Sequence, residues 1–506
     1  MPDFYLDFDD LCADRRKATV RRICMQSMVA GLILALSGCG LIAPKATPNS
    51  IVEVPAKWSA TGTSATTNAS LLAQWWLRFN DPLLSSLAAQ ALQANTSVNT
   101  AQAALRQARA LRDVAAAALL PQVGVSASAQ RTTSGTNNTI TTNGNRNTFQ
   151  VGLDASWELD IFGANRSALN ASEAAAQASA ASLGDVQVSI AAEVAINYIT
   201  LRGAQARLAI AENNLASQLE TLQITQWRLQ AGLVSSLEAE QARAAAEQTR
   251  SLVPTLQTSI EQTRHALAVL TGQPPATLSS VLSTASPVPQ AADDLALSMP
   301  AETLRQRPDV RAAEQQVIAA IARVAQADAA RMPNFKLSGS LGLSALTLGS
   351  LTSGASVVSA ILAGVSMPIF DGGAGSAQVR AQQAALDQAR FAYKAVILTA
   401  LKDVENALVA LRGDRERLLR LQQAAEAAGN AALMARQRYS SGIVDFQVVL
   451  ETQRTQLNTQ DSAASADIDV SADHVRLYKA LGGGWLPDNN SATGAPIEDT
   501  TKSSGL

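Results

Sequence analysis

Apolar residues occupy every second position in a stretch of the first half of the chain. They are Phe149, Val151, Leu153, Ala155 and Trp157. The alternate positions from 150 to 158 carry polar residues, a glycine and two carboxylates, Asp154 and Glu158. Period two predicts a strand with one apolar and one polar face. Residues 123–130 alternate in the same way, and the connecting residues 131–147 are rich in Thr, Asn and Gly. We therefore predict a hairpin over about residues 122–158.

A second hairpin is predicted over about residues 334–367. Its first strand alternates Phe335, Leu337, Leu341 and Leu343 with Lys and Ser, and its second strand is expected within residues 357–367. Residues 337–370 contain no charged side chain, so a transmembrane helix is the alternative interpretation. Five glycines in this stretch and the parallel with the first hairpin favour strands.

Two long stretches have the composition of continuous helices. Neither residues 165–230 nor residues 374–440 contain a proline. A helix of such length would extend for roughly 100 Å, which is rare in globular domains. The second stretch carries a narrow apolar stripe at Tyr393, Val396, Ile397, Ala400, Val404, Ala407, Leu408 and Leu411. Its spacing predicts a coiled-coil seam. An amphipathic helix on an ordinary core is the alternative.

The chain is a tandem duplication with a period of about 210 residues. The stretch QWRLQAGLVS around Gly232 returns as QRYSSGIVD around Gly442, and Pro121 and Pro333 mark a second matching pair. Each half predicts a helix, two strands and a long helical hairpin. We place the first repeat, with the lipidated N-terminus, at 39–300 and the second at 301–485. The glycines are expected to end one helix of each hairpin, at turns near 232 and 442.

Composition argues against several classes of function. The net charge is −2, which provides no basic surface for nucleic acid. There are two histidines, and the three cysteines (Cys12, Cys24 and Cys39) all lie near the N-terminus. No Gly-x-x-x-x-Gly-Lys-Ser/Thr nucleotide loop is present in the sequence. We therefore expect no enzyme, no cofactor and no metal site.

The N-terminus has the pattern of an export signal. Five basic residues between 15 and 22 precede a mostly apolar run from Ile23 to Leu36. The sequence Leu36-Ser37-Gly38-Cys39 resembles a bacterial lipobox, which implies a signal peptide at 1–38 and lipidation of Cys39. An ordinary signal peptide with a chance cysteine is the alternative. Residues 486–506 are rich in polar and small residues and are expected to be disordered.

Strands of about ten residues with one apolar face are typical of membrane barrels. Four strands cannot close a barrel, because about eight is the practical minimum. The pattern therefore predicts a barrel shared between chains. A soluble sandwich is the alternative, but the pattern offers no second sheet to cover the apolar face.

Several further motifs stand out along the chain: WWLRFNDP at 75–82, WELDIFG at 157–163, RPDV at 307–310 with Arg311 and Glu314, IFDGG at 369–373, and YKALGGGW at 478–485. Together they resemble the TolC-like outer-membrane factors, in particular the lipoprotein branch of resistance-nodulation-division efflux systems. The resemblance implies a mixed α/β membrane protein. Its homotrimer would form a twelve-stranded transmembrane β-barrel continuous with an α-helical coiled-coil barrel in the periplasm.

The same resemblance implies the function and the partners. The chain would be the exit duct of a tripartite efflux pump, conducting drugs or other small compounds passively across the outer membrane. Its partners would be a periplasmic adaptor, an inner-membrane resistance-nodulation-division pump and outer-membrane lipid. An export duct for peptides or proteins is one alternative. A non-conducting coiled-coil scaffold lipoprotein is another, and it predicts no membrane strands.

Site residues are likewise implied at the hairpin tips. Arg438 and Tyr439 match an Arg-Tyr pair that ties neighbouring helices at a periplasmic gate, and Glu451 matches an acidic position that is normally Asp. Gln447 stands where relatives usually carry Leu, which argues against an apolar constriction. Adaptor docking is expected at Gly232, Leu233, Val234, Gly442, Ile443 and Val444. The alternatives are a solvated helix end for the gate residues, and turn chemistry with packing inside the hairpin for the docking residues.

Overall fold

The computed structural model describes residues 72–132, 146–291, 301–353 and 355–485. The predicted signal peptide, Cys39 and the predicted tail lie outside these residues. Contacts divide the described chain into two units, which are presented separately. Residues 121–164 and 325–375 form a sheet unit, and the remaining residues form a helical unit.

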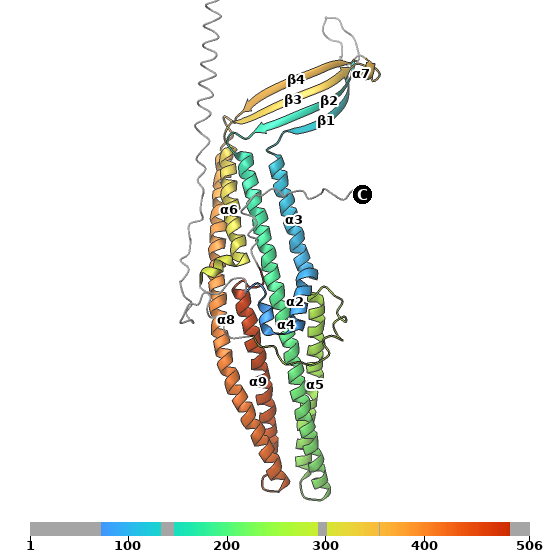
Figure 1. Cartoon of the computed structure of the whole chain (residues 1–506), viewed down its shortest axis with the longest axis vertical. Coiled ribbons are helices and arrows are strands. Elements are labelled where there is room, and N and C mark those ends of the chain that lie inside the picture. Colours follow the sequence, from blue (N-terminus) through green and yellow to red (C-terminus); the bar gives the residue numbers. More distant parts are fainter. Residues whose placement is uncertain (1–71, 133–145, 292–300, 354, 486–506) are drawn as a thin grey trace, which may run out of the picture. The chain divides into compact units, whose positions relative to one another are not determined.

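The sheet unit is a single antiparallel sheet of four strands. These are β1 (Gln122–Thr132), β2 (Arg146–Leu159), β3 (Asn334–Ala345) and β4 (Ser356–Ser366), in the order β1-β2-β3-β4 (Figure 1). The short helix α7 (Ser350–Ser353) lies between β3 and β4 in the chain. Each repeat contributes one hairpin, and β2 pairs with β3 to join the two. The transmembrane-helix alternative for residues 337–370 is therefore wrong.

The register aligns the alternating positions of neighbouring strands. Leu153 of β2 faces Val125 of β1 and Leu341 of β3. Side chains at paired positions share one face of a sheet, so the apolar residues form one continuous face. Strand β4 departs from this rule, because Val358 and Leu362 lie in register with Gly342 and Ser338 of the polar face.

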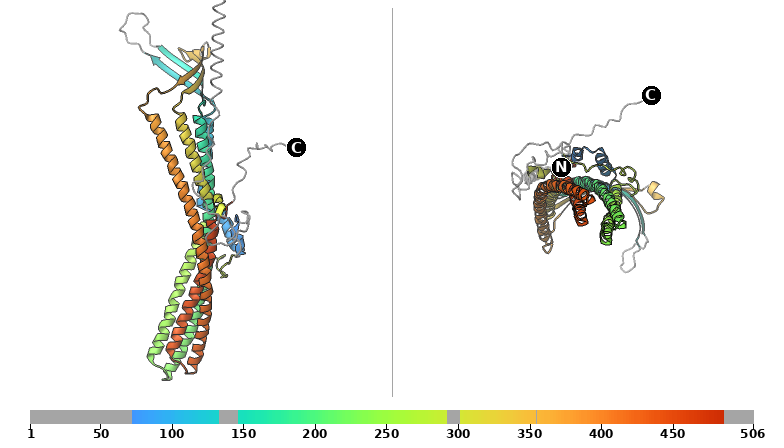
Figure 2. Two further views of the ribbon diagram at one scale, coloured as in Figure 1. Left: turned by 90° about the vertical axis from the view of Figure 1, so that its left-hand side faces the viewer. Right: turned by 90° about the horizontal axis from the view of Figure 1, so that it is seen from below.

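The helical unit repeats its elements with equal lengths. Both α4 (Ala164–Gln230) and α8 (Ala374–Ser440) have 67 residues, and both α5 (Ser236–Leu270) and α9 (Phe446–Ala480) have 35. The shorter helices α3 (Thr96–Ala117) and α6 (Pro308–Ala329) have 22 residues each. These three pairs of helices of equal length confirm the predicted internal repeat. Figure 2 shows α4 with α5 and α8 with α9 as two helical hairpins side by side.

An aromatic cluster anchors the core of the helical unit. Trp75 and Phe79 of the short helix η2 (Trp75–Phe79) are buried, and Trp75 stacks on Tyr478 of α9 with ring centroids 5.4 Å apart. The stripe predicted on α8 joins the same core: seven of its eight residues are buried, and Val396 packs against them. The predicted apolar stripe is thus confirmed as the buried face of α8, and its assignment to a coiled-coil seam stays a prediction.

Hydrogen bonds join α4 to two other segments of the chain, one just before α2 and one after α5. Asp81 accepts from the backbone N–H groups of Leu83 and Leu84 and so caps α2 (Pro82–Ala94), and it also accepts from the Tyr198 hydroxyl at 2.7 Å. Arg202 donates to that hydroxyl at 3.0 Å and to the Thr284 carbonyl at 2.6 Å. Burial, followed by the Asp81 hydrogen bond, raises the pKa of Tyr198 to about 12.

Another short helix, η3 (Ala301–Gln306), precedes α6. Across the described residues, no helix combines the length and the apolar character that a membrane span requires.

Candidate functional site

The tips of the two helical hairpins have the same backbone conformation. Gly232 and Gly442 both have φ of 72°. The N–H groups of the residues that follow, Leu233 and Ile443, reach back to the carbonyls of Arg228 and Arg438 at 2.8 and 2.9 Å. This pattern is a Schellman end, which requires a left-handed residue and so favours glycine.

The tips present one large apolar side chain each. Leu233 is 73% exposed and Ile443 is 72% exposed. Val234 and Val444 are half-buried instead, and Val444 packs against a small core at the tip. Of the six predicted docking residues, Gly232, Leu233, Gly442 and Ile443 are therefore exposed, Val234 is half-buried, and Val444 packs within its hairpin tip.

The small core at the tip joins three of the four helices. It contains Ala242, Ala245, Ala435, Tyr439, Phe446, Val449 and Leu450. Tyr439 contacts Phe446 with ring centroids 5.7 Å apart. Its side chain is buried, and among the described residues its hydroxyl has no hydrogen-bond partner. Tyr439 therefore points into its own chain.

Arg228 of α4 connects the first hairpin to the second. Its guanidinium lies over the Tyr439 ring at 4.5 Å from the centroid, and its Nη2 donates to the Ser440 carbonyl at 3.3 Å. This residue was not identified from the sequence, although a signal existed: the 210-residue period pairs Arg228 with Arg438, because each lies four residues before its turn glycine.

The other predicted gate residues are exposed. Arg438, Gln447 and Glu451 all have exposed side chains. The Gln447 side-chain amide donates to the side-chain oxygen Oε1 of Gln241 at a long 3.4 Å, across the two hairpins. The structure does not bring Arg438 and Glu451 together: in the described part of the chain, neither side chain makes a hydrogen bond or ion pair.

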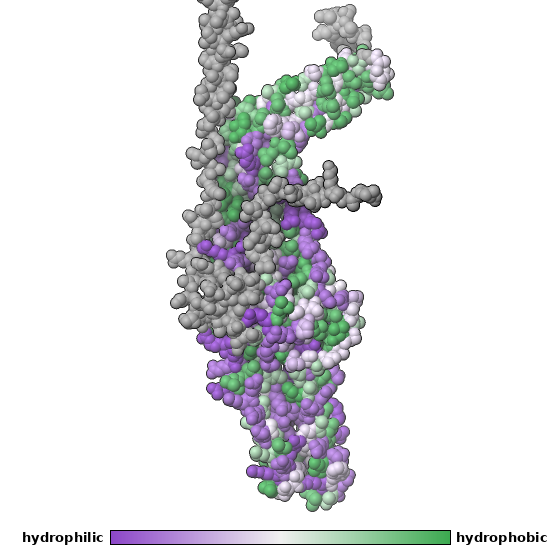
Figure 3. All heavy atoms as spheres, in the orientation of Figure 1, coloured by the Kyte–Doolittle hydropathy of each residue, from purple (hydrophilic) through white to green (hydrophobic). Residues whose placement is uncertain are grey.

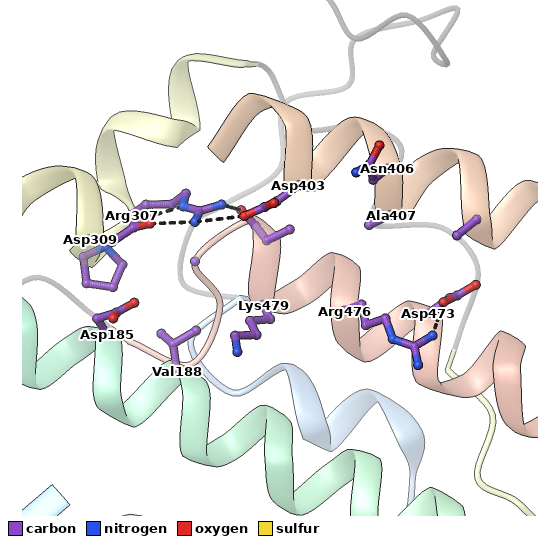
Figure 4. A pocket seen from close by; sticks show the side chains of 14 residues that line it. Asp185, Val188, Arg307, Asp309, Asp403, Asn406, Ala407, Asp473, Arg476 and Lys479 are labelled. Atoms are coloured by element: carbon purple, nitrogen blue, oxygen red, sulfur yellow. Dashed lines mark hydrogen bonds and ion pairs between the residues drawn. The ribbon is translucent and has the colours of Figure 1, made fainter. Parts of the chain in front are cut away.

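A pocket of about 370 Å³ lies in the helical unit, where α9 ends and α6 begins (Figure 4). Arg307 joins these two ends. It binds the Asp309 carboxylate through Nε at 3.0 Å and Nη2 at 2.7 Å, and its Nη1 donates to the Ala480 carbonyl at 2.6 Å. Two motifs singled out in the sequence, 307–310 and 478–485, thus pack on one another. Arg311 extends this contact, with its guanidinium 5.4 Å from the Trp485 ring centroid.

Several pocket residues had not been singled out in the sequence. Lys479 belongs to the motif at 478–485, but Asp185 of α4, Asp403 and Asn406 of α8, and Asp473 and Arg476 of α9 do not. They are single charged or amide residues on long helices, so no local motif marks them. No group of three or more potential metal ligands occurs in the described residues.

The sheet unit exposes its apolar face. Val125 is 76% exposed and Ile361 is 86% exposed, and Figure 3 shows hydrophobic side chains gathered over the strands. On the opposite face the Ser126 hydroxyl donates to Asp154 at 2.6 Å. A large exposed apolar surface marks a protein or membrane contact.

The comparisons with known proteins agree with these features. The sequence model of the outer membrane efflux protein family matches residues 87–273 and 299–483. The chain is 32% identical to the pyoverdine export outer membrane protein OpmQ of Pseudomonas putida, over 90% of this chain and 97% of the relative. It is 32% identical to the toluene efflux pump outer membrane protein TtgF of Pseudomonas putida, over 91% of this chain and 97% of the relative.

A solved structure has the same fold. The outer-membrane channel OprN superposes with a TM-score of 0.80 at 36% identity, covering 86% of this chain and 98% of that one. The predicted fold class, family and outer-membrane location are confirmed. The chain belongs to the outer membrane efflux protein family of TolC-like factors, and it is the exit channel of an efflux pump in the cell outer membrane.

Proposed function

We propose that three copies of the chain build one duct that is gated at the hairpin tips. The four-stranded sheet leaves β1 and β4 as edges, and its apolar face is exposed. In a trimer, β1 of one copy pairs with β4 of the next, which completes twelve strands and removes the open edges. The exposed apolar face then contacts lipid.

The gate is formed by Arg438, Gln447 and Glu451. Their exposure at the tip, while Tyr439 is buried, is the observation that carries this proposal. Three Glu451 carboxylates around a narrow axis create a focused negative potential, which attracts cations and restrains leakage of other solutes. Arg438 is free to bind a neighbouring copy. Tyr439 supports the gate from inside its own chain, through Phe446 and Arg228.

The tips also dock a periplasmic adaptor. Leu233 and Ile443 offer apolar contacts, and the two glycines hold the turns that present them. An inner-membrane resistance-nodulation-division pump supplies the energy, so the channel performs no covalent chemistry and uses no cofactor. Relatives are named for the efflux of toluene and the export of pyoverdine, which supports small compounds as the substrate class.

The N-terminus anchors the mature chain in lipid through Cys39. The sequence pattern Leu36-Ser37-Gly38-Cys39 supports this part of the proposal. Cleavage before Cys39 is tested by mass spectrometry of the mature N-terminus. A diacylated cysteine supports the anchor, and a free N-terminus elsewhere contradicts it.

Single-channel conductance in planar bilayers tests the gate. The purified wild-type trimer is expected to show a small, mostly closed conductance, which rises severalfold in Glu451→Ala and in Arg438→Ala. Glu426→Ala is the matched control, because Glu426 is an exposed glutamate of α8 away from the tip. Equal currents in all four proteins would contradict the gate. A folded trimer without any conductance would favour the scaffold hypothesis.

A further inference from the structure

Ile369 and Phe370 are the two most exposed of the large hydrophobic side chains in the described residues. Ile369 is 100% exposed and Phe370 is 91% exposed. Both lie in the link between β4 and α8, within the sheet unit, where β4 is an edge strand (Figure 1). Apolar side chains in full contact with solvent indicate a surface that is covered in the assembled protein.

The first repeat contains the same dipeptide after its own hairpin, and there it is partly covered. Ile161 and Phe162 follow β2 and are 46% and 44% exposed. The Phe162 ring contacts the ring of Phe335, with centroids 6.4 Å apart. Phe335 is the second residue of β3, the first strand of the next hairpin. The dipeptide that ends one hairpin thus lies against the beginning of the following hairpin.

The second repeat has no following hairpin among the described residues. The matched prolines at 121 and 333 place Val123 where the second repeat has Phe335, and Val123 is 70% exposed. In the trimer, the strand beside β4 is β1 of the neighbouring copy. An Ile-Phe dipeptide and an apolar residue at the start of a strand, which touch inside the chain, are therefore also exposed at the two opposite edges of the sheet.

Strand β2 shows how far such a strand extends when a following hairpin is present. Its register with β1 ends where Ser156 lies opposite Gln122. It then continues for three residues that pair with β3 alone, and the last of them, Leu159, lies opposite Phe335. The second strand of a hairpin therefore gains three residues from the hairpin that follows it.

Strand β4 stops at the point where β2 would stop without β3. Its last residue, Ser366, lies opposite Asn334, the counterpart of Gln122. The next three residues are therefore the counterparts of those that β2 gains, and the third of them, Ile369, falls opposite Val123 of a neighbouring copy. The faces agree, because alternation along an extended strand places both side chains on the apolar face of the sheet.

We infer that residues 367–370 are a subunit-docking segment whose partner is the start of β1 in a second copy of this chain. On assembly the segment extends β4, with Ile369 in register with Val123 of the neighbouring copy. Phe370 then covers that residue, as Phe162 covers Phe335 within the chain. The inference rests on the β1–β4 pairing of the proposed trimer and deepens it by fixing the register. The internal repeat favours a second copy over lipid as the occupant, since protein covers the first dipeptide.

Disulfide crosslinking of the full chain in outer membranes tests this register. Directly opposite residues of antiparallel strands have Cα atoms about 4.5–5.5 Å apart, which a disulfide can bridge, whereas residues shifted by two lie about 7–8 Å apart. We expect oxidation to link most of the double variant Ile369→Cys, Val123→Cys into dimers and trimers. Val365→Cys with Ala127→Cys is the matched pair within the two strands, and Val365→Cys with Val125→Cys is the pair shifted by two.

Such a disulfide cannot form within one chain, because three strand spacings, about 14 Å, separate β1 from β4. The single-cysteine variants measure any background from Cys39. Crosslinking of the Val365–Ala127 pair alone would overturn the docking segment and leave the trimer intact. Preferred crosslinking of the shifted pair would overturn the register. No crosslink in any pair would contradict the β1–β4 pairing itself, and the inference with it.

The heat stability of the trimer gives a second readout. Phe370→Ser should lower the temperature at which the trimer dissociates on gels, and Phe370→Leu should keep most of the wild-type value, because leucine retains the apolar contact. Leu348→Ser is the matched control, since Leu348 is 70% exposed in the link between β3 and α7. An unchanged temperature in Phe370→Ser, or an equal loss in Leu348→Ser, would overturn the docking role of Phe370.

Discussion

Arg228 is the residue that connects the two hairpin tips within one chain. It covers the Tyr439 ring and donates to the Ser440 carbonyl. A cation–π contact at an exposed site contributes about 0.5–1 kcal/mol, and the hydrogen bond adds to it. The tip of α8 and α9 is therefore held to α4 by a contact small enough to break during the opening proposed above.

Arg228→Ala should loosen this connection and raise the open fraction of the channel. A loss of about 1 kcal/mol corresponds to roughly a fivefold change in an opening equilibrium. Arg228→Lys should behave nearly as Arg228→Ala, because an ammonium cannot stack as a planar guanidinium does. Mean current in planar bilayers measures the change. Arg243→Ala, an exposed arginine of α5, should leave the current unchanged; an equal rise there would contradict the prediction.

The sequence could predict the tip but not the direction of each side chain. Tyr439 was expected to tie neighbouring helices, which stays a prediction; the structure buries it beside Phe446, in a core shared with α5 and beneath Arg228 of α4. Residues 438 and 439 are adjacent on one helix, so about 100° separates their side chains. Which of them faces the core depends on the packing of α5 and α9, and no local pattern encodes that choice.

Asp185 provides a pH-dependent prediction at the same scale. Its pKa is raised above the ordinary value of 3.8, first by burial and then by Asp309. A raised carboxyl pKa means that the folded state binds the proton more tightly, so the charged carboxylate destabilises the fold above the folded pKa. The penalty disappears as pH falls through the folded pKa toward 3.8.

Asp185→Asn should therefore be more stable than wild type at neutral pH. The difference should shrink as pH falls through the folded pKa, because the wild-type carboxyl becomes neutral there. Thermal unfolding of the detergent-solubilised protein over a pH series measures this. A constant difference at every pH would show that the amide acts through packing rather than charge, which would contradict the prediction.

At the scale of elements, one glycine is required by the turn it forms and another is not required by its surroundings. Gly272 ends α5 with φ of +72°, and a Cβ placed there would lie 2.6 Å from the Ala94 carbonyl oxygen at the end of α2. Asn95 donates to the Leu270 carbonyl at 2.9 Å across the same junction. Gly413 lies inside α8, and a Cβ there meets nothing within 4 Å.

Gly272→Ala and Gly413→Ala should thus change stability in opposite directions. The first should destabilise the protein by about 1–3 kcal/mol, because strain and a backbone clash combine. The second should stabilise it by up to about 1 kcal/mol, since alanine favours a helix interior. Thermal unfolding of both variants gives the comparison. A destabilised Gly413→Ala, or an unchanged Gly272→Ala, would contradict this account.

Helices and strands were predictable from the sequence where apolar residues recur with a regular period. The α8 stripe and the first hairpin both have a single buried or apolar face, and the sequence predicted them correctly. Strand β4 was harder to define, because Val358 and Leu362 interrupt its alternation. A strand that is apolar on both faces carries no period-two signal, so only its pairing with β3 defines it.

At the scale of the whole molecule, duplication explains how one chain provides four strands. Each repeat makes one hairpin, and the pairing of β2 with β3 merges the two into one sheet. The sequence predicted both hairpins, but it could not predict that the hairpins pair with each other. That contact joins residues that lie far apart in the chain, such as Leu153 and Leu341.

The exposed apolar face of this sheet makes the membrane assignment testable. Ile361 lies on that face in register with Gly339, whereas Ser340 lies on the opposite, polar face. A lysine on the lipid-facing side of a barrel costs about 2–4 kcal/mol near the bilayer midplane, and a lysine facing the lumen costs much less.

Ile361→Lys should therefore reduce the heat-modifiable trimer recovered from outer membranes, while Ser340→Lys should assemble normally. Gel mobility of unheated membrane extracts measures both. If Ser340→Lys fails and Ile361→Lys assembles, the two faces are assigned in reverse, and the side chains of Asp154 and Ser126 would have to face lipid.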